Sequence, residues 1–505
     1  MSSGHDLLDR KEYNKAIKFF SDVLKTDVDN IKAINGLAEA THRSGDPMGA
    51  LKLYHRSLEL DQNQPEAWIS IGNIHYYNKD NSQALRAYEK AKDLRPDHAR
   101  TYNNIGTIHK ENGNYPDALS NYKIAFKYDP NYALVCRNIG DVHLKDGNNL
   151  EAIDWLHKAT GLDPDNLYGW YWLGRAYYRS GKIKESVGHF LRVLSRKPDL
   201  PQVHHDLGKA YFGLRKYREA IEHVKQAMIR NPSIPHYYIT LSKIYDNLHQ
   251  ETRALATLDT ALTWNRSDPV VWIAKGDIHK QNGRMQEALK CYDMAVSFRS
   301  DHWRGYYKKG VALYYLSRLE EAKEALEEAL RMKNKDAGSN HFIGMVYLAQ
   351  NDPDTAFDYL YEASILDSMN ADIWFHLGQG CMRLEDWSDA EKYLQRSIEL
   401  NERNKEALYA IGQVYQKMNK LDRSRDHLAT FKKLSDFEKD RDALLTEIRV
   451  RPTELNLYRE LAILYEQHDY VTQAAEVLRK SVYLGDKEAK EELTRLKSLI
   501  EIDQR

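Results

Sequence analysis

The chain has 505 residues with a formal net charge of −1, and 29% of its side chains are charged against 42% hydrophobic. The balanced charge argues against a general surface for nucleic acids or anionic membranes, so we expect neither as a partner. No apolar run approaches the ~20 residues of a membrane span, and the N-terminus lacks an apolar signal core. The three cysteines, Cys136, Cys291 and Cys381, form no metal spacing. We therefore expect a water-soluble protein with reduced thiols in the cytoplasm, without insertion into a membrane.

Residues 1–30 are predicted to form a truncated helical repeat. Tyr13, Ala16 and Phe20 roughly match the late positions of the pattern that fills the following residues, and Gly4 precedes them. The first helix of this unit is therefore expected to be clipped.

A period of 34 residues dominates the next part of the chain. Small residues recur at this interval without insertion: Ala38, Gly72, Gly106, Gly140, Gly174, Gly208, Ser242, Gly276, Gly310, Gly344, Gly378 and Gly412. A second column of alanine or serine follows twelve residues after each of them, from Ala50 to Ser424. Such a period indicates a solenoid of stacked units, here twelve contiguous units over residues 31–438.

Each unit has the pattern of two helices, as residues 99–132 illustrate. Two apolar faces follow helical spacing, one with Tyr102, Ile105, Gly106 and His109, the other with Ala118, Tyr122 and Ala125. Gly113 separates them, at a position where a helix ends in a left-handed residue. Pro130 then stops the second helix, because proline cannot continue it. The small residues are expected where the two helices cross closely.

The register breaks after Gly412, because the next small residue of the column is Ala462, 50 residues further on. Residues 439–454 are therefore interpreted as an irregular helical insertion, an extra or extended helix that ends near Pro452. A final unit is predicted over 455–488. Residues 489–505 place apolar side chains on one face only, which is typical of a capping helix.

The columns of glycine, tyrosine, alanine and proline at 34-residue spacing resemble the tetratricopeptide repeat (TPR) family over nearly the whole chain. The resemblance implies an all-α, right-handed superhelical solenoid of about 13 stacked helical hairpins with a C-terminal capping helix. It implies no particular function, because this scaffold hosts many partners.

The resemblance also implies that certain positions of each first helix line a concave groove. Tyrosine and arginine at such positions provide large contact areas with polar tips. The predicted partner-binding residues are Asn104, Arg137, Asn138, Tyr171, Arg175, Tyr178, Lys209, Phe212, Tyr307, Lys308 and Tyr314. Arg175 and Lys209 hold equivalent positions in successive repeats, so we expect two neighbouring cations and an acidic or aromatic partner segment. The competing interpretation is that many of these tyrosines pack between helices.

The sequence matches the residue patterns of two specialised TPR grooves only in part. The carboxylate clamp of chaperone-binding repeats would need matching residues two repeats before Arg304 and Lys308, where Ile239 and Lys243 do not fit. The asparagine ladder of O-linked N-acetylglucosamine transferase is matched only by Asn104 and Asn138, with Trp172 next.

No catalytic, cofactor or metal-binding constellation stands out. The histidines of one column, such as His75 and His109, belong to stacked helices about 8–10 Å apart, too far to share one zinc ion. The sequence thus favours a non-enzymatic scaffold that binds extended peptide segments of partner proteins. The alternative is a regulatory or substrate-presenting subunit of a separately encoded transferase or protease, and self-association is also open.

Overall fold

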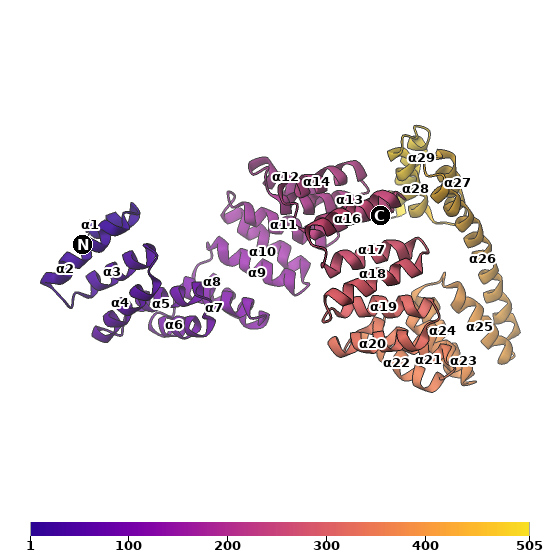
Figure 1. Ribbon diagram of the computed structural model, residues 1–505, viewed down its shortest axis with the longest axis horizontal. Helices are drawn as coiled ribbons and strands as arrows, with labels where there is room; N and C mark the ends of the chain where they lie inside the picture. The colour runs from indigo at the N-terminus through magenta and orange to yellow at the C-terminus, as the bar shows by residue number, and fades with distance from the viewer. Residues whose placement is uncertain (1, 504–505) are drawn as a thin grey trace. The chain divides into compact units, whose positions relative to one another are not determined.

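The computed structural model describes residues 2–503, and in this range the chain forms 29 α-helices and no strand (Figure 1). The chain divides into two compact units, a first unit of residues 1–198 and a second unit of residues 199–505. The prediction of an all-α fold of stacked hairpins is confirmed, and the number of hairpins is close to the predicted one.

The first unit contains twelve helices in six antiparallel pairs. Their bounds are α1 (Ser2–Asp9), α2 (Tyr13–Thr26), α3 (Ile31–Arg43), α4 (Pro47–Leu60), α5 (Pro65–Tyr77), α6 (Asn81–Leu94), α7 (Ala99–Glu111), α8 (Tyr115–Tyr128), α9 (Ala133–Lys145), α10 (Asn149–Leu162), α11 (Leu167–Arg179) and α12 (Ile183–Arg196). The first of them, α1, has only eight residues against the 13 of a regular first helix.

The second unit continues the same alternation. Its helices are α13 (Pro201–Gly213), α14 (Tyr217–Arg230), α15 (Pro235–Asn247), α16 (Glu251–Trp264), α17 (Pro269–Gln281), α18 (Met285–Phe298), α19 (Trp303–Tyr315), α20 (Leu319–Met332), α21 (Ala337–Ala349), α22 (Pro353–Leu366), α23 (Ala371–Arg383), α24 (Trp387–Leu400), α25 (Lys405–Lys417), α26 (Leu421–Val450), α27 (Leu455–Gln467), α28 (Val471–Tyr483) and α29 (Ala489–Asp503).

Local sequence signals explain the helix ends. In α4, the Asp46 carboxylate accepts a hydrogen bond from the backbone N–H of Gly49 at 2.8 Å, and Pro47 occupies the first turn. The turn inside each hairpin has one left-handed residue, as at Gly113 with φ +78°. Because glycine lacks a Cβ atom, it adopts this conformation without steric cost.

The small-residue column lies where the two helices of a hairpin cross. A Cβ atom added to Gly72 would lie 2.5 Å from Cε1 of Tyr88, and one added to Gly344 would lie 2.6 Å from Cγ of Leu360. Both distances are shorter than van der Waals contact, so a larger residue would push the helices apart. The large side chain of the second helix fills the space that glycine leaves.

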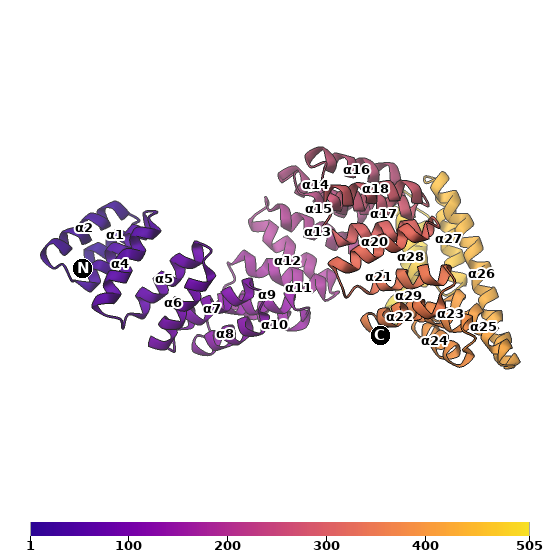
Figure 2. The same ribbon diagram turned by 60° about the horizontal axis from the view of Figure 1, so that its bottom comes forward.

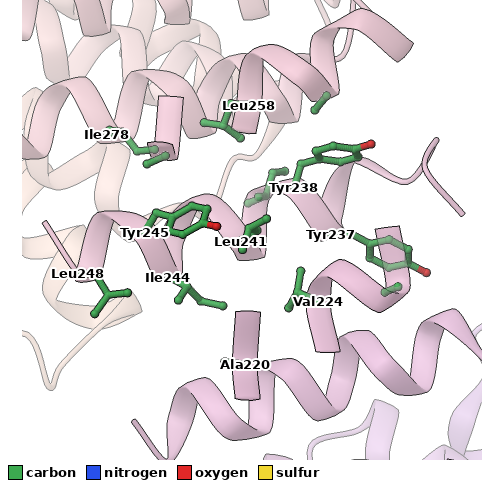
Figure 3. Packing of buried hydrophobic residues seen from close by; sticks show 14 of the residues in the cluster. Ala220, Val224, Tyr237, Tyr238, Leu241, Ile244, Tyr245, Leu248, Leu258 and Ile278 are labelled. Carbon is green, nitrogen blue, oxygen red and sulfur yellow. The ribbon is translucent and has the colours of Figure 1, made fainter. Parts of the chain in front are cut away.

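The core is a succession of apolar clusters along the stack. One such cluster joins α14 to α17 in the second unit, with Tyr237, Leu241, Ile244 and Leu258 almost fully buried (Figure 3). This distribution is typical of a solenoid, in which each repeat packs against its neighbours.

The register break of the sequence corresponds to one long helix. α26 runs without interruption over 30 residues and buries only Ser424, Phe437 and Ile448. Figures 1 and 2 show it running from α25 to α27 along the edge of the second unit. The last helix of the second unit, α29, buries Ala489, Leu493 and Leu496 against α27 and α28. Residues 504–505 of the predicted capping helix lie outside the described range.

We expect Gly174→Leu to destabilise the first unit by about 1–3 kcal/mol or more, because overpacking a close helix crossing forces backbone shifts. A Cβ atom at Gly174 would lie 2.7 Å from Cε1 of Phe190. The matched control is Gly188→Leu, on α12 of the same hairpin, where an added Cβ atom meets nothing within 4 Å. Urea unfolding followed by circular dichroism measures both. Equal stability of the two variants would contradict the close crossing.

Candidate functional site

The first helices of three successive hairpins in the first unit are joined by side-chain amides. Asn104 Nδ2 of α7 donates to Asn73 Oδ1 of α5 at 3.2 Å, and Asn138 Nδ2 of α9 donates to Asn103 Oδ1 of α7 at 2.9 Å. Asn138 is only 5% exposed. Two of the predicted groove residues, Asn104 and Asn138, therefore use part of their hydrogen-bonding capacity inside the protein.

Beside this amide row lies a small cavity of about 320 Å³. Its lining comes from the first helices α7, α9 and α11 and comprises Lys110, Arg137, Asn138, Asp141, Tyr168 and Trp172. Lys110 Nζ and Asp141 Oδ2 form an ion pair of 3.0 Å, so one of the two cations of the cavity is neutralised locally. Arg137 provides the second cation and lies 3.5 Å from the Asn138 side-chain oxygen.

Two aromatic rings of α11 lie near the guanidinium group of Arg175 on the same helix. This group lies 4.7 Å from the centroid of the Trp172 ring and 5.8 Å from that of Tyr171. Such cation–π contacts hold a cation at an aromatic surface. Tyr171, Arg175 and Tyr178 are all half-buried. They lie together on α11 in the first unit, whereas Lys209 and Phe212 belong to α13 in the second unit.

The second unit contains a larger cavity of about 530 Å³, which we call the basic pocket. All of its lining residues come from the first helices α13, α15, α17 and α19. The apolar part comprises Phe212, Ile239, Val270, Ile273, Ala274 and Ile278, and the polar part Ser242, Lys243, Asp246, Asn247, Asp277, Lys280, Gln281 and Lys308. The predicted residues Phe212 and Lys308 are thus part of one cavity.

The three lysines of the basic pocket have different surroundings. Lys308 Nζ pairs with Asp277 Oδ1 at 2.9 Å, and the same carboxylate oxygen accepts a hydrogen bond from the Tyr292 hydroxyl at 2.8 Å. Lys280 lies 5.7 Å from the Tyr315 ring centroid, and within residues 2–503 no ion pair is found for it. Burial, and then the neighbouring Lys308, lower the pKa of Lys280. An anion entering the pocket would stabilise this ammonium group.

The remaining predicted groove residues, Lys209, Tyr307 and Tyr314, contact other side chains of the second unit. Lys209 pairs with Asp206 at 3.0 Å. Tyr307 and Tyr314 pack edge-to-face against Phe342 of α21, with ring centroids 6.1 and 5.9 Å away. Burial raises the pKa of Tyr307 to about 12. Both tyrosines contribute packing between helices and are half-buried, and their part in partner binding stays a prediction.

Sequence reasoning missed the apolar floor and the carboxylates of the basic pocket. Val270, Ile273 and Asp277 were not among the expected groove residues, although they share the first helix of one repeat. Val270 and Ile273 gave little indication of a binding surface in the sequence, because an apolar residue on such a helix usually contributes to the core. Arg215 and His249 were missed as well; each holds the left-handed turn position that is glycine in several other repeats.

Buried titratable groups also occur away from the pocket. His341 Nε2 of α21 lies 3.0 Å from His376 Nδ1 of α23. Burial, together with the neighbouring His376, lowers the pKa of His341 from 6.5 to about 3. Within the described part of the chain, no group of three or more histidine, cysteine or acidic side chains is arranged to hold a metal ion.

Family models match several segments of the sequence. Residues 72–113 and 140–181 match a TPR repeat model, and residues 99–132, 167–200, 270–302, 307–371 and 371–404 match tetratricopeptide repeat models. The chain belongs to the tetratricopeptide repeat family. Proteins of this family mediate protein–protein interactions. Among curated proteins, no sequence matches the chain.

Solved structures of TPR proteins are similar to this chain at low sequence identity. They include the APC/C hetero-tetramer Cut9-Hcn1 (15% identity, TM-score 0.41, covering 98% of this chain and 95% of that one) and yeast Tom70 (14%, 0.40, 92% and 99%). A tetratricopeptide repeat protein from Parabacteroides merdae aligns with 49% of this chain and 98% of its own (17%, 0.39). At these identities and TM-scores, the likeness carries no information about partners.

None of the helices in the described part of the chain combines the length and the apolar character that crossing a membrane requires.

We expect acid to destabilise the second unit through His341. Since its pKa is depressed in the folded state, the neutral ring stabilises the fold above pH 6.5, and this stabilisation is lost as pH falls toward about 3. At pH 5 the loss amounts to about 2 kcal/mol. Urea unfolding midpoints between pH 8 and pH 5 should therefore fall less for His341→Gln than for the parent chain. His236→Gln, at an exposed position of α15, is the control. Equal pH slopes for all three proteins would refute the role of His341.

Proposed function

We propose that this protein is a non-enzymatic interaction scaffold that binds extended segments of partner proteins on the surface of its first helices. The observation that carries the proposal is the basic pocket, whose lining comes entirely from four successive first helices, α13, α15, α17 and α19. A surface contributed by successive repeats suits a segment that runs along the stack, because each repeat can contact a further residue of the segment.

The chemistry of the pocket favours a partner residue with a carboxylate close to an apolar side chain. Lys243 is exposed and Lys280 half-buried, and neither has an ion-pair partner within residues 2–503. Ile239, Val270 and Ile273 offer an apolar floor beside them. An acidic partner residue would pair with the two ammonium groups, and its apolar neighbour would cover the floor. The cation–aromatic surface of Arg175 in the first unit is proposed as a second site of similar preference.

The pocket is tested by selecting peptides from a random displayed library against the full chain. We expect enrichment of sequences with Asp or Glu beside a large apolar residue, and binding that weakens as salt rises. Lys243→Glu/Lys280→Glu should reduce the affinity of the selected peptides at least tenfold, because it replaces attraction by repulsion.

The matched control is Lys225→Glu/Lys290→Glu, which makes the same charge change at exposed positions of the second helices α14 and α18. Equal loss of binding in both variants would show that the net charge of the protein, and not the pocket, determines the affinity. Full binding by the pocket variant, with unchanged circular dichroism, would refute the pocket as the site.

The surface on α11 is tested by Tyr171→Ala/Arg175→Ala/Tyr178→Ala. We expect this variant to fold and to lose those selected peptides that still bind the Lys243→Glu/Lys280→Glu variant, because it removes the rings and the cation that they hold. Titration calorimetry with these peptides measures the effect. Retention of all of them by the folded triple variant would show that α11 contributes no binding surface.

A further inference from the structure

The final repeat contacts two much earlier repeats of the second unit. Arg215 lies in the turn between α13 and α14, and its Nη1 is 3.0 Å from Glu476 Oε1 of α28. Tyr217, at the start of α14, is 2% exposed, and its ring lies 6.0 Å from that of Tyr483 in an edge-to-face arrangement. These contacts join positions more than 250 residues apart in the sequence.

The next turn along the stack contributes to the same contact. His249 follows α15 and, together with residues of α26, α27 and α28, lines a cavity of about 200 Å³. The other lining residues are Leu445, Ile448, Tyr458, Leu461, Tyr465, Gln473, Glu476, Val477 and Lys480. Arg215 and His249 have φ values of 58° and 57° and hold equivalent turn positions, 34 residues apart. They therefore project from the same edge of the stack.

The length of α26 explains how the chain returns to these turns. Thirty residues at 1.5 Å per residue give a rod of ~45 Å, which carries the chain from α25 to the final repeat (Figure 1). Since α13 to α25 pack successively and α28 meets the turns of α13–α14 and α15–α16, the path of the second unit closes on itself.

The contact is made by side chains and combines charged groups with aromatic rings. The turns contribute Arg215 and His249, the last turn of α15 contributes Asp246, and the C-terminal helices contribute Glu476 and Lys480. The apolar clusters on the two sides are separate; among the described residues of the final repeat, Tyr483 alone packs against the cluster of α14–α17. Because the charges of this contact are partly buried, desolvation offsets much of their attraction, and they add little net stability to it.

We propose that this contact is a reversible intramolecular clasp, in which α28 is the ligand and the turns around Arg215 and His249 are its docking surface. Closure joins the two ends of the second unit, and opening separates them without unfolding either apolar cluster.

The clasp also shares a residue with the basic pocket, and this part of the inference rests on the proposed function. Asp246 lines the pocket, and within residues 2–503 it forms no ion pair with Lys243 or Lys280. Its Oδ1 accepts a hydrogen bond from Asn282 Nδ2 at 3.4 Å, and the charges of Lys480 and Arg449 act on it. When α28 leaves, Asp246 loses the neighbouring charge of Lys480. A bound acidic segment would then meet a more negative pocket, so closure of the clasp and binding of the segment should favour each other.

Acid should open the clasp through His249. Burial, followed by the charges of Lys480 and Arg449, lowers the pKa of His249 from 6.5 to about 4. The titratable groups around this ring are Arg449 on α26, Tyr458 and Tyr465 on α27, and Glu476 and Lys480 on α28. Asp246 on α15 interacts with the same two cations, Lys480 and Arg449. Because the closed state holds the ring neutral, closure is favoured above pH 6.5 and weakens as pH falls. Between pH 8 and pH 5 the closing constant should fall by about thirtyfold.

The test is hydrogen exchange of the full chain without any partner, for Glu476→Arg, Arg215→Glu and the double exchange Arg215→Glu/Glu476→Arg. Each single variant places like charges together, so exchange in α28 and at the start of α14 should rise about tenfold. The double variant restores an ion pair and should return exchange to that of the parent. At pH 5, after correction for the intrinsic pH dependence of exchange, the parent should resemble the single variants in α28 and at the start of α14, whereas His249→Gln should show a smaller change at these two places.

Arg495→Glu is the control, because Arg495 on α29 pairs with Glu466 on α27 and not with α13–α16. It should leave exchange at the start of α14 unchanged. Unchanged exchange in both single variants would show that the clasp does not form in solution. A rise throughout the second unit would show that the contact is a fixed part of the fold, and either result overturns the proposal. Neither result bears on peptide binding by Lys243 and Lys280, which is measured separately.

Discussion

The close helix crossing inside each hairpin is the constraint on which the rest of the structure depends. Where Gly72 faces Tyr88, or Gly344 faces Leu360, no room exists for another carbon atom. The crossing determines which face of the first helix packs against the second helix. Because the small residue recurs every 34 residues, the same face packs inward in successive hairpins. Side chains at other positions of the first helices are thereby free to serve as a common surface, and the basic pocket lies there. Arg215 and His249 are also one period of 34 residues apart, so both lie on one edge of the stack.

Much of the fold could be predicted from the sequence, because its signals are local. Helix-ending residues such as Gly113, the small-residue column and the prolines all act within one repeat, and the small-residue column recurs in all twelve regular repeats. The return of α28 to α14 could not be predicted in this way, since it joins Tyr217 to Tyr483 through a contact that no periodicity describes. Only the register break before Ala462 indicated that the regular stacking ends there.

The candidate site could be predicted less completely, because a position in a repeat does not determine what surrounds a side chain. Lys308 was expected in the groove, yet Asp277 pairs with it, whereas Lys280 one repeat earlier lies near the Tyr315 ring and forms no ion pair within residues 2–503. Tyr307 and Tyr314 satisfied the same positional rule and pack against Phe342. Charge compensation and ring packing across neighbouring helices decide which groove residues remain available to a partner, and both depend on residues tens of positions away in the sequence.

The central claim is that partners bind on the surface of the first helices. Hydrogen exchange of the full chain with and without a peptide selected from a random library tests it most directly, because exchange locates binding without any substitution. We expect protection of α15, α17 and α19, the helices that carry Lys243, Lys280 and Lys308. Protection confined to the second helices α14, α16 and α18, with the first helices unchanged, would contradict it.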